Sequence, residues 1–129
     1  MAVEIKSYRT PLGRVRSLGS AHSGAGDSWR MRLTSLALVP LTIGFVWLVL
    51  ALLHMDYNSA RATLAEPLPA ILLLLFVLTG VYHMHLGMQS VIVDYVHGHG
   101  REWALIANLF FAAALGLACV YAVLRIGFV

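Results

Sequence analysis

Small and polar residues recur at helical spacing inside an apolar stretch that ends near residue 95. Gly80, His83, Gly87, Ser90 and Asp94 fall within about 80° of one another on a helix that turns about 100° per residue. We call this set the polar stripe. Its small residues let a flat group or another helix approach closely, and an intramembrane imidazole needs a partner or a function. The stripe therefore permits two interpretations. Either His83 reaches the metal of a planar macrocycle, or the stripe packs against a neighbouring helix.

The same stretch holds further side chains that could take part in chemistry. His85 lies about 200° around the helix from His83, so the two imidazoles cannot bind one metal, and we interpret His85 as packed or water-bonded. Asp94 and Tyr95 end the stretch, where a phenol can sit at an apolar boundary and offer its hydroxyl to a polar ligand such as a quinone headgroup. An ordinary interfacial Tyr beside a helix-end Asp is the alternative.

A haem iron with two axial ligands would need a second histidine besides His83. His54 lies near the opposite end of the apolar segments, and His97 and His99 lie in a polar loop, so none is at a comparable depth. The second ligand would have to come from a partner chain. The haem interpretation therefore predicts that this chain is a subunit.

The composition is that of a membrane protein. Of the 129 residues, 60% are hydrophobic and 12% are charged, which is more apolar side chain than a small globular core can bury. Nine Lys and Arg exceed six Asp and Glu, but the basic residues gather near the N-terminus, which argues against a nucleic-acid-binding protein. Cys119 is the single cysteine, so an internal disulfide and a multi-cysteine metal site are both excluded.

Three segments are long and apolar enough to cross a hydrocarbon core about 30 Å thick, at about 1.5 Å of helix per residue. We predict an all-α integral membrane protein with three transmembrane helices, in which Pro40 causes a mild kink in the first. Residues 54–66 would form a polar turn between the first two helices. The expected spans are residues 31–55, 67–95 and 103–125.

The distribution of basic residues predicts the orientation in the membrane. Residues 1–30 form a predicted cytoplasmic arm, followed by an anchor domain of residues 31–127, and the arm lacks the apolar region of a cleaved secretory signal. By the positive-inside rule the N-terminus lies in the cytoplasm, and three crossings place the C-terminus in the periplasm. We expect the bacterial inner membrane in preference to the mitochondrial one. The basic residues that precede the first span are Lys6, Arg9, Arg14, Arg16, Arg30 and Arg32.

The segment HMHLGMQSVIVDYV resembles a motif of a known family. It fits the pattern H-x3-G-M-x5-D-Y-V of the small haem-b membrane anchor subunit of succinate dehydrogenase, respiratory complex II. The start of the first span, RMRLTSLALVP, is similar to the family's Arg-x-Thr entry into its first membrane helix. The resemblance covers residues 17–127. The matching motif positions are His83, Gly87, Met88, Asp94, Tyr95 and Val96.

This resemblance implies a role for four residues. His83 would be one axial ligand of a haem b that is shared with a histidine of a second anchor subunit, in a bundle formed by both chains. Arg32 would lie near the haem propionates. Tyr95 would donate a hydrogen bond to a ubiquinone carbonyl, and Asp94 would help to order the polar groups around that site.

The resemblance also implies a heterotetrameric succinate:ubiquinone oxidoreductase in which this chain is a non-catalytic subunit. The sequence has neither a dinucleotide fingerprint nor the cysteines for iron–sulfur clusters, so FAD and the clusters would belong to a flavoprotein subunit and an iron–sulfur subunit. Electrons from succinate would pass through the iron–sulfur subunit, docked on the cytoplasmic face, to ubiquinone beside Tyr95.

Two alternatives belong to other functional classes. The chain could be a non-haem membrane scaffold or assembly subunit of a multi-subunit complex, in which the polar stripe only packs against a helix. It could also conduct protons through His83, His85 and Asp94. The first and third spans carry no matching ionisable residue at depth, which argues against the proton relay.

Overall fold

The structure is a computed structural model, and it describes residues 21–128. Residues 1–20, which make up most of the predicted cytoplasmic arm, lie outside the described residues. The described part of the chain is helical and contains no strand, which confirms the all-α prediction. Its helices are α2 (Ala21–Leu52), α3 (Tyr57–Ala65), α4 (Pro67–Tyr95) and α5 (His99–Phe128).

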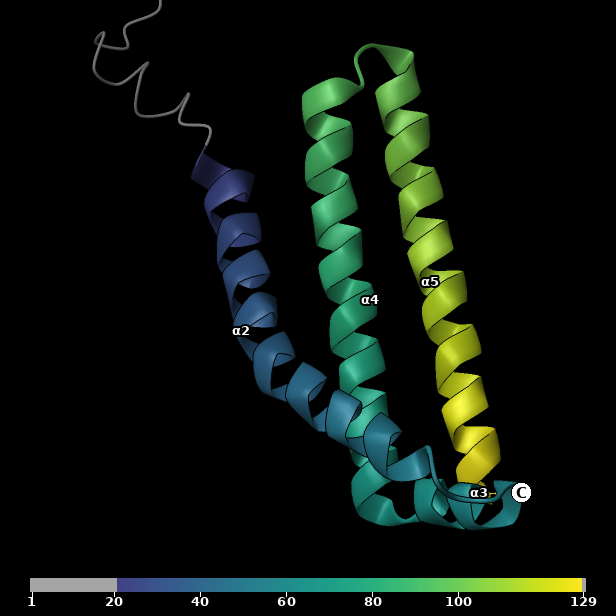
Figure 1. The fold of residues 1–129 in the computed structure, drawn as a ribbon. Helices are drawn as coiled ribbons and strands as arrows, with labels where there is room; N and C mark the ends of the chain where they lie inside the picture. The colour runs from purple at the N-terminus through teal and green to yellow at the C-terminus, as the bar shows by residue number, and fades with distance from the viewer. Residues whose placement is uncertain (1–20, 129) are drawn as a thin grey trace, which may run out of the picture.

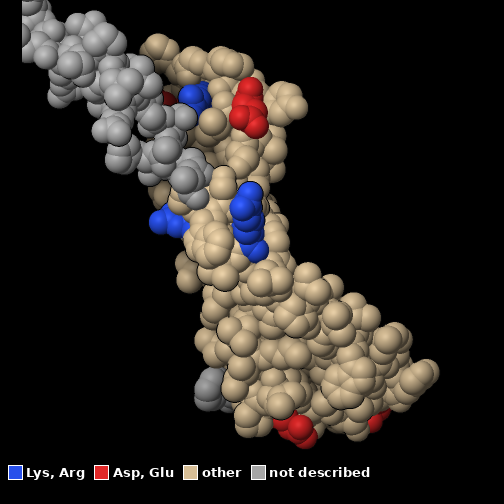
Figure 2. Space-filling view, turned by 90° about the vertical axis from the view of Figure 1, so that its left-hand side faces the viewer, with Lys and Arg blue, Asp and Glu red and all other residues tan. Residues whose placement is uncertain are grey.

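Three of these helices are long and apolar enough to cross a membrane, as the sequence predicts. The spans are Gly26–Leu52, Pro67–Tyr95 and His99–Gly127, of 27, 29 and 29 residues. At about 1.5 Å per residue each is roughly 40 Å long, so each helix can tilt or extend into the headgroup region. In Figure 2, a band without Lys, Arg, Asp or Glu separates the basic and acidic side chains in the upper part of the visible face from the acidic side chains at its lower end.

The helix bounds differ from the expected spans at several points. Helix α2 begins at Ala21 and so includes the last part of the predicted arm, and α5 begins at His99, before the expected start at residue 103. Gly98 makes the short turn between α4 and α5 possible, because it adopts φ 69°, a conformation that is strained for other residues. Pro67 is at the start of α4. A proline costs no helical hydrogen bond there, because the N–H groups of the first turn have no partner within the helix.

The connection between α2 and α4 contains a helix where a polar turn is expected. Asp56 is the N-cap of α3, and its carboxylate accepts hydrogen bonds from the backbone N–H groups of Asn58 and Ser59. The hydroxyl of Ser59 also donates to this carboxylate and is the main reason why the pKa of Asp56 is lowered. Because this pKa is lowered, the ionised carboxylate of Asp56 contributes to the stability of the folded chain. This contribution is fully present above the ordinary pKa of an aspartate and is lost as the pH falls through the lowered value.

Helix α4 is the central element of the bundle, because it packs against α2 on one side and α5 on the other (Figure 1). Helix α3 lies across one end and contacts both α4 and α5. Where α2 meets α4, the rings of Phe45 and Phe76 stack with centroids 4.5 Å apart. Helix α2 contains Pro40, and Figure 1 shows that the helix bends along its length, as expected for a proline inside a helix.

Little of the apolar surface is buried within the chain. The buried hydrophobic residues of the described region are Leu48, Leu86, Ile92 and Ala112. Large side chains such as Trp47 and Leu117 remain exposed, at 68% and 72%. Such a surface would aggregate in water, whereas lipid tails or partner helices can cover it. The fold therefore leaves most of its apolar area to be covered by lipid or by partner helices.

Candidate functional site

His83 lies on the face of α4 that packs against α2, and its ring has a polar partner there. Nδ1 of His83 is 2.8 Å from the hydroxyl oxygen of Thr34 on α2. The imidazole is half-buried, and within the described residues its ring makes this one hydrogen bond. The contact satisfies one ring nitrogen inside the bundle and leaves Nε2 without a hydrogen-bond partner in the described part of the chain.

The polar stripe contacts α2 through His83, but its two glycines leave space beside the backbone. A Cβ added to Gly80 would meet nothing within 4 Å, and one added to Gly87 would come no closer than 3.9 Å to the terminal methyl of Met31. The glycines one turn before and one turn after the imidazole therefore leave room beside the backbone. This space and the imidazole of His83 are of the kind that a planar macrocycle with a histidine-bound metal would need.

His85 faces the other neighbour, α5. The side-chain amide nitrogen of Asn108 lies 3.1 Å from Nδ1 of His85 and 3.1 Å from its backbone carbonyl oxygen. Asn108 is 6% exposed and is the buried polar residue of the described region. This contact agrees with the interpretation of His85 as a packed side chain, and it shows that the two histidines of α4 point to different helices.

The contact between Asn108 and His85 gives a first prediction. Replacing Asn108 by Leu keeps the branched outline of the side chain but removes the amide that joins α5 to α4. We expect the assembled complex to lose about 1 kcal/mol of stability, the usual scale for a polar contact between membrane helices. Unfolding of the detergent-purified complex with increasing SDS measures the change. An unaltered unfolding midpoint would show that this contact does not contribute to helix association.

Asp94 and Tyr95 end the same helix but point to different surroundings. Asp94 lines a cavity of about 450 Å³ between α2, α4 and α5, together with Ser90 and Arg101. Tyr95 does not line this cavity and is 79% exposed. A phenol in this position is free to meet a ligand that arrives from the membrane or from a partner surface. Asp94 and Tyr95 lie about 16 Å of helix rise or more from His83, so a macrocycle and a headgroup need not collide.

Arg32 lies near this region but on the exposed side of α2. It is about 200° around the helix from Thr34, the residue that contacts His83. Arg32 is therefore on a different face of α2 from the one that meets α4, and it is exposed. A group bound beside His83 would therefore meet the Arg32 side chain only if that side chain reached around α2.

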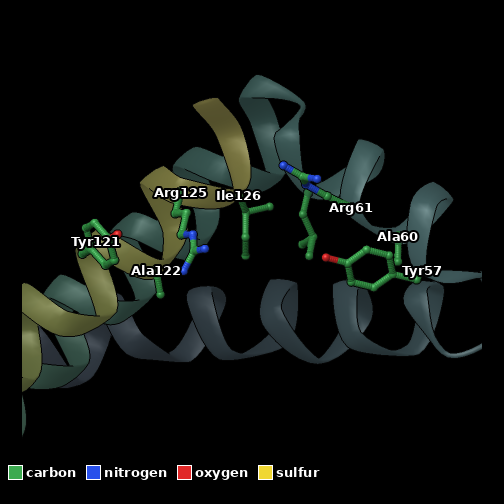
Figure 3. A pocket seen from close by; sticks show the side chains of 8 residues that line it. Tyr57, Ala60, Arg61, Tyr121, Ala122, Arg125 and Ile126 are labelled. Atoms are coloured by element: carbon green, nitrogen blue, oxygen red, sulfur yellow. The ribbon is translucent and has the colours of Figure 1, made fainter. Parts of the chain in front are cut away.

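A larger cavity, of about 660 Å³, lies at the opposite end of the bundle between α3 and α5. Figure 3 shows Arg61 and Tyr57 from α3 on one side of it and Arg125 and Tyr121 from α5 on the other. None of the predicted site residues lines this cavity. Tyrosines and arginines gather where helices leave the hydrocarbon, so this composition is typical of the interfacial end of a membrane bundle.

Two residues of the site region were not singled out from the sequence as polar partners. Thr34 belongs to the Arg-x-Thr match at the start of the first span, but nothing in that match pairs it with His83. Asn108 carries a signal of its own, because an uncharged amide in the middle of an apolar span needs a hydrogen-bond partner. Its partner, however, lies 23 residues away on another helix.

Comparison with known proteins decides the family. The family model described as succinate dehydrogenase/fumarate reductase transmembrane subunit matches residues 6–124. The chain belongs to this family. This membership confirms the resemblance seen in the sequence and makes the chain a multi-pass membrane anchor subunit, a non-catalytic part of a larger complex.

Relatives match along nearly the whole chain. The succinate dehydrogenase hydrophobic membrane anchor subunit of Paracoccus denitrificans is 35% identical over 120 residues, which cover 93% of this chain and 93% of that protein. The protein of the same name from Rickettsia bellii (strain RML369-C) is 32% identical over 117 residues, or 90% of this chain and 94% of the relative. No solved structure matches the chain significantly.

Proposed function

We propose that this chain anchors succinate dehydrogenase in the membrane, binds haem b together with a second anchor subunit, and contributes to the site where ubiquinone is reduced. The anchor role follows from the family and its relatives. The observation that supports the haem role is the environment of His83, whose Nδ1 is engaged by Thr34. Its Nε2 has no hydrogen-bond partner among the described residues, and Gly80 and Gly87 leave space beside the helix one turn before and one turn after His83.

Each residue of the site would have a distinct task. His83 would direct the lone pair of Nε2 at the iron, and Gly80 and Gly87 would leave the space that a planar group needs. When bound, haem b supplies a one-electron carrier inside the membrane. The second axial histidine would come from the partner anchor subunit. Arg32 would reach past the edge of α2 toward the propionates, since a guanidinium pairs well with a carboxylate.

Tyr95 and Asp94 would serve the quinone. The exposed phenol of Tyr95 would donate a hydrogen bond to a carbonyl oxygen of ubiquinone, which holds the headgroup near the end of α4. Asp94 would order polar groups on the neighbouring face, where it lines a cavity together with Arg101. Succinate oxidation would take place in the flavoprotein subunit with FAD, and the iron–sulfur subunit would deliver the electrons to this end of the bundle.

The proposed orientation places the end of α4 on the cytoplasmic side of a bacterial inner membrane. Arg30 and Arg32 precede the apolar part of α2 in the sequence, and Figure 1 shows that α2 begins at the end of the bundle where α4 ends. Positive charge beside the first membrane helix favours the cytoplasmic side. The C-terminus would then lie in the periplasm, and the iron–sulfur subunit would dock at the end that holds Asp94 and Tyr95.

The absorbance of the assembled complex tests the haem role. We expect the complex purified after coexpression of all four subunits to show the dithionite-reducible spectrum of a low-spin b-type haem, in a ratio of about one haem to one flavin. The reduced-minus-oxidised difference spectrum measures it. A stable but colourless four-subunit complex, apart from its flavin and clusters, would favour the non-haem scaffold.

A further inference from the structure

The hydroxyl of Thr34 joins two segments of the membrane domain that are distant in the sequence. It lies on α2, and its contact with Nδ1 of His83 on α4 spans 49 positions of the chain. Both side chains are half-buried, so the contact is shielded from water on part of its surface. Polar contacts between membrane helices are few and directional, so this one fixes how the imidazole is turned relative to α2.

The surroundings of the hydroxyl indicate which group donates the proton. The Thr34 oxygen lies 2.9 Å from the carbonyl oxygen of Arg30 and 3.0 Å from that of Met31. A carbonyl can only accept, and a hydroxyl has one hydrogen to donate. If this hydrogen is directed to either carbonyl, the remaining contact must be made by an N–H on Nδ1 of His83, which donates to the Thr34 oxygen.

The opposite arrangement is less favourable inside a membrane. If Thr34 donated to Nδ1, a neutral imidazole would carry its hydrogen on Nε2. That N–H would then have no acceptor in the described part of the chain, and an unsatisfied donor inside a membrane is unfavourable. The hydrogen-bond pattern therefore favours the tautomer with the hydrogen on Nδ1 and a free lone pair on Nε2.

We propose that Thr34 is a positioning residue, which holds His83 in the tautomer and ring orientation that ligation of iron through Nε2 requires. The inference rests on the proposed haem role of His83 and extends it to a residue of another helix. Histidine ligands of metals almost always donate their other N–H to an acceptor, which orients the ring and raises its basicity. Here the acceptor is a hydroxyl whose own hydrogen is held by the α2 backbone.

Two substitutions at Thr34 and one at its neighbour test the proposal in the assembled complex. Thr34→Val keeps the shape of the side chain and removes the hydroxyl, and Thr34→Ser keeps the hydroxyl. Ser35→Ala is a matched control, because the Ser35 hydroxyl also donates to the backbone of α2, at 2.8 Å from the carbonyl oxygen of Met31. Ser35 is exposed and makes no hydrogen bond to His83 within the described part of the chain.

We expect T34V to retain haem about tenfold to a hundredfold more weakly, the usual loss when an outer partner of a metal-bound histidine is removed. The haem that remains should show shifted electron paramagnetic resonance g-values and a higher midpoint potential, because a less basic imidazole stabilises ferric iron less. T34S should restore all three properties toward those of the unaltered complex, and S35A should leave them unchanged. These readouts do not depend on quinone reductase activity.

The outcomes separate this inference from the haem role itself. Unchanged g-values, potential and haem retention in T34V would overturn the positioning role of Thr34 even if His83 binds haem. If a His83 variant keeps its haem, the proposed role of His83 as the iron ligand fails instead. Should T34V not assemble, Thr34→Ala removes the same hydroxyl with a smaller side chain. The comparison of T34S with the unaltered complex also shows whether a hydroxyl at this position is enough to preserve the haem spectrum.

Discussion

Replacing His83 by Leu is expected to abolish the haem-b absorbance of the purified complex, or to reduce it to a small fraction. Leucine fills a similar volume on α4 but has no lone pair for iron. Losing a direct metal ligand should weaken binding by more than the roughly tenfold to hundredfold effect of losing an outer partner. The ratio of haem to flavin in the purified complex, from the reduced-minus-oxidised spectrum, measures the change.

His85→Leu is the matched control for this experiment. It removes an imidazole two residues away on the same helix, and with it one of the two contacts of Asn108, whose bond to the backbone carbonyl of His85 remains available. We expect H85L to keep its haem and to be modestly less stable. If H83L kept its spectrum while H85L lost it, the iron ligand would have to be reassigned to His85.

Replacing Tyr95 by Phe is expected to lower ubiquinone reductase activity about tenfold, with succinate oxidation by an artificial soluble dye largely unchanged. The substitution removes a single hydroxyl from a side chain that is 79% exposed, so the fold should not change. One hydrogen bond contributes about 0.5–1.5 kcal/mol, which corresponds to a factor of between about two and ten. A larger loss is expected if the bond strengthens as charge develops on the quinone oxygen.

The two assays of the Tyr95 variant must be compared on the same preparation. Tyr121→Phe is a suitable control, because Tyr121 is also exposed, at 65%, and lines the cavity at the opposite end of the bundle. It should leave both activities unchanged. Equal losses of quinone and dye activity in Y95F would indicate damage to assembly or electron delivery, and would argue against a direct role of this hydroxyl at the quinone.

Several features of this protein could be predicted from the sequence because they depend on local properties. A helix satisfies its backbone hydrogen bonds within one segment, so the length of each apolar run was enough to predict three membrane helices. The angular spacing along one helix also separates His83 from His85, and the structure places their partners on different neighbouring helices, α2 and α5. The motif around His83 and Tyr95 was likewise sufficient to identify the family, which its relatives confirm.

Other features depend on contacts between distant segments, and only the tertiary structure decided them. Periodicity shows which residues share a face of a helix but not which helix that face meets, so neither Thr34 opposite His83 nor Asn108 opposite His85 could be paired in advance. Helix α3 was expected as a turn because its apolar pattern is too short to stand out, and its Asp56 cap and its contacts with α4 and α5 support it. Asp94 lines a cavity and Tyr95 lies on the surface because of the way α2 and α5 pack around α4. Packing energies between helices depend on the shape of both partners, and a single stretch of sequence contains only one of them.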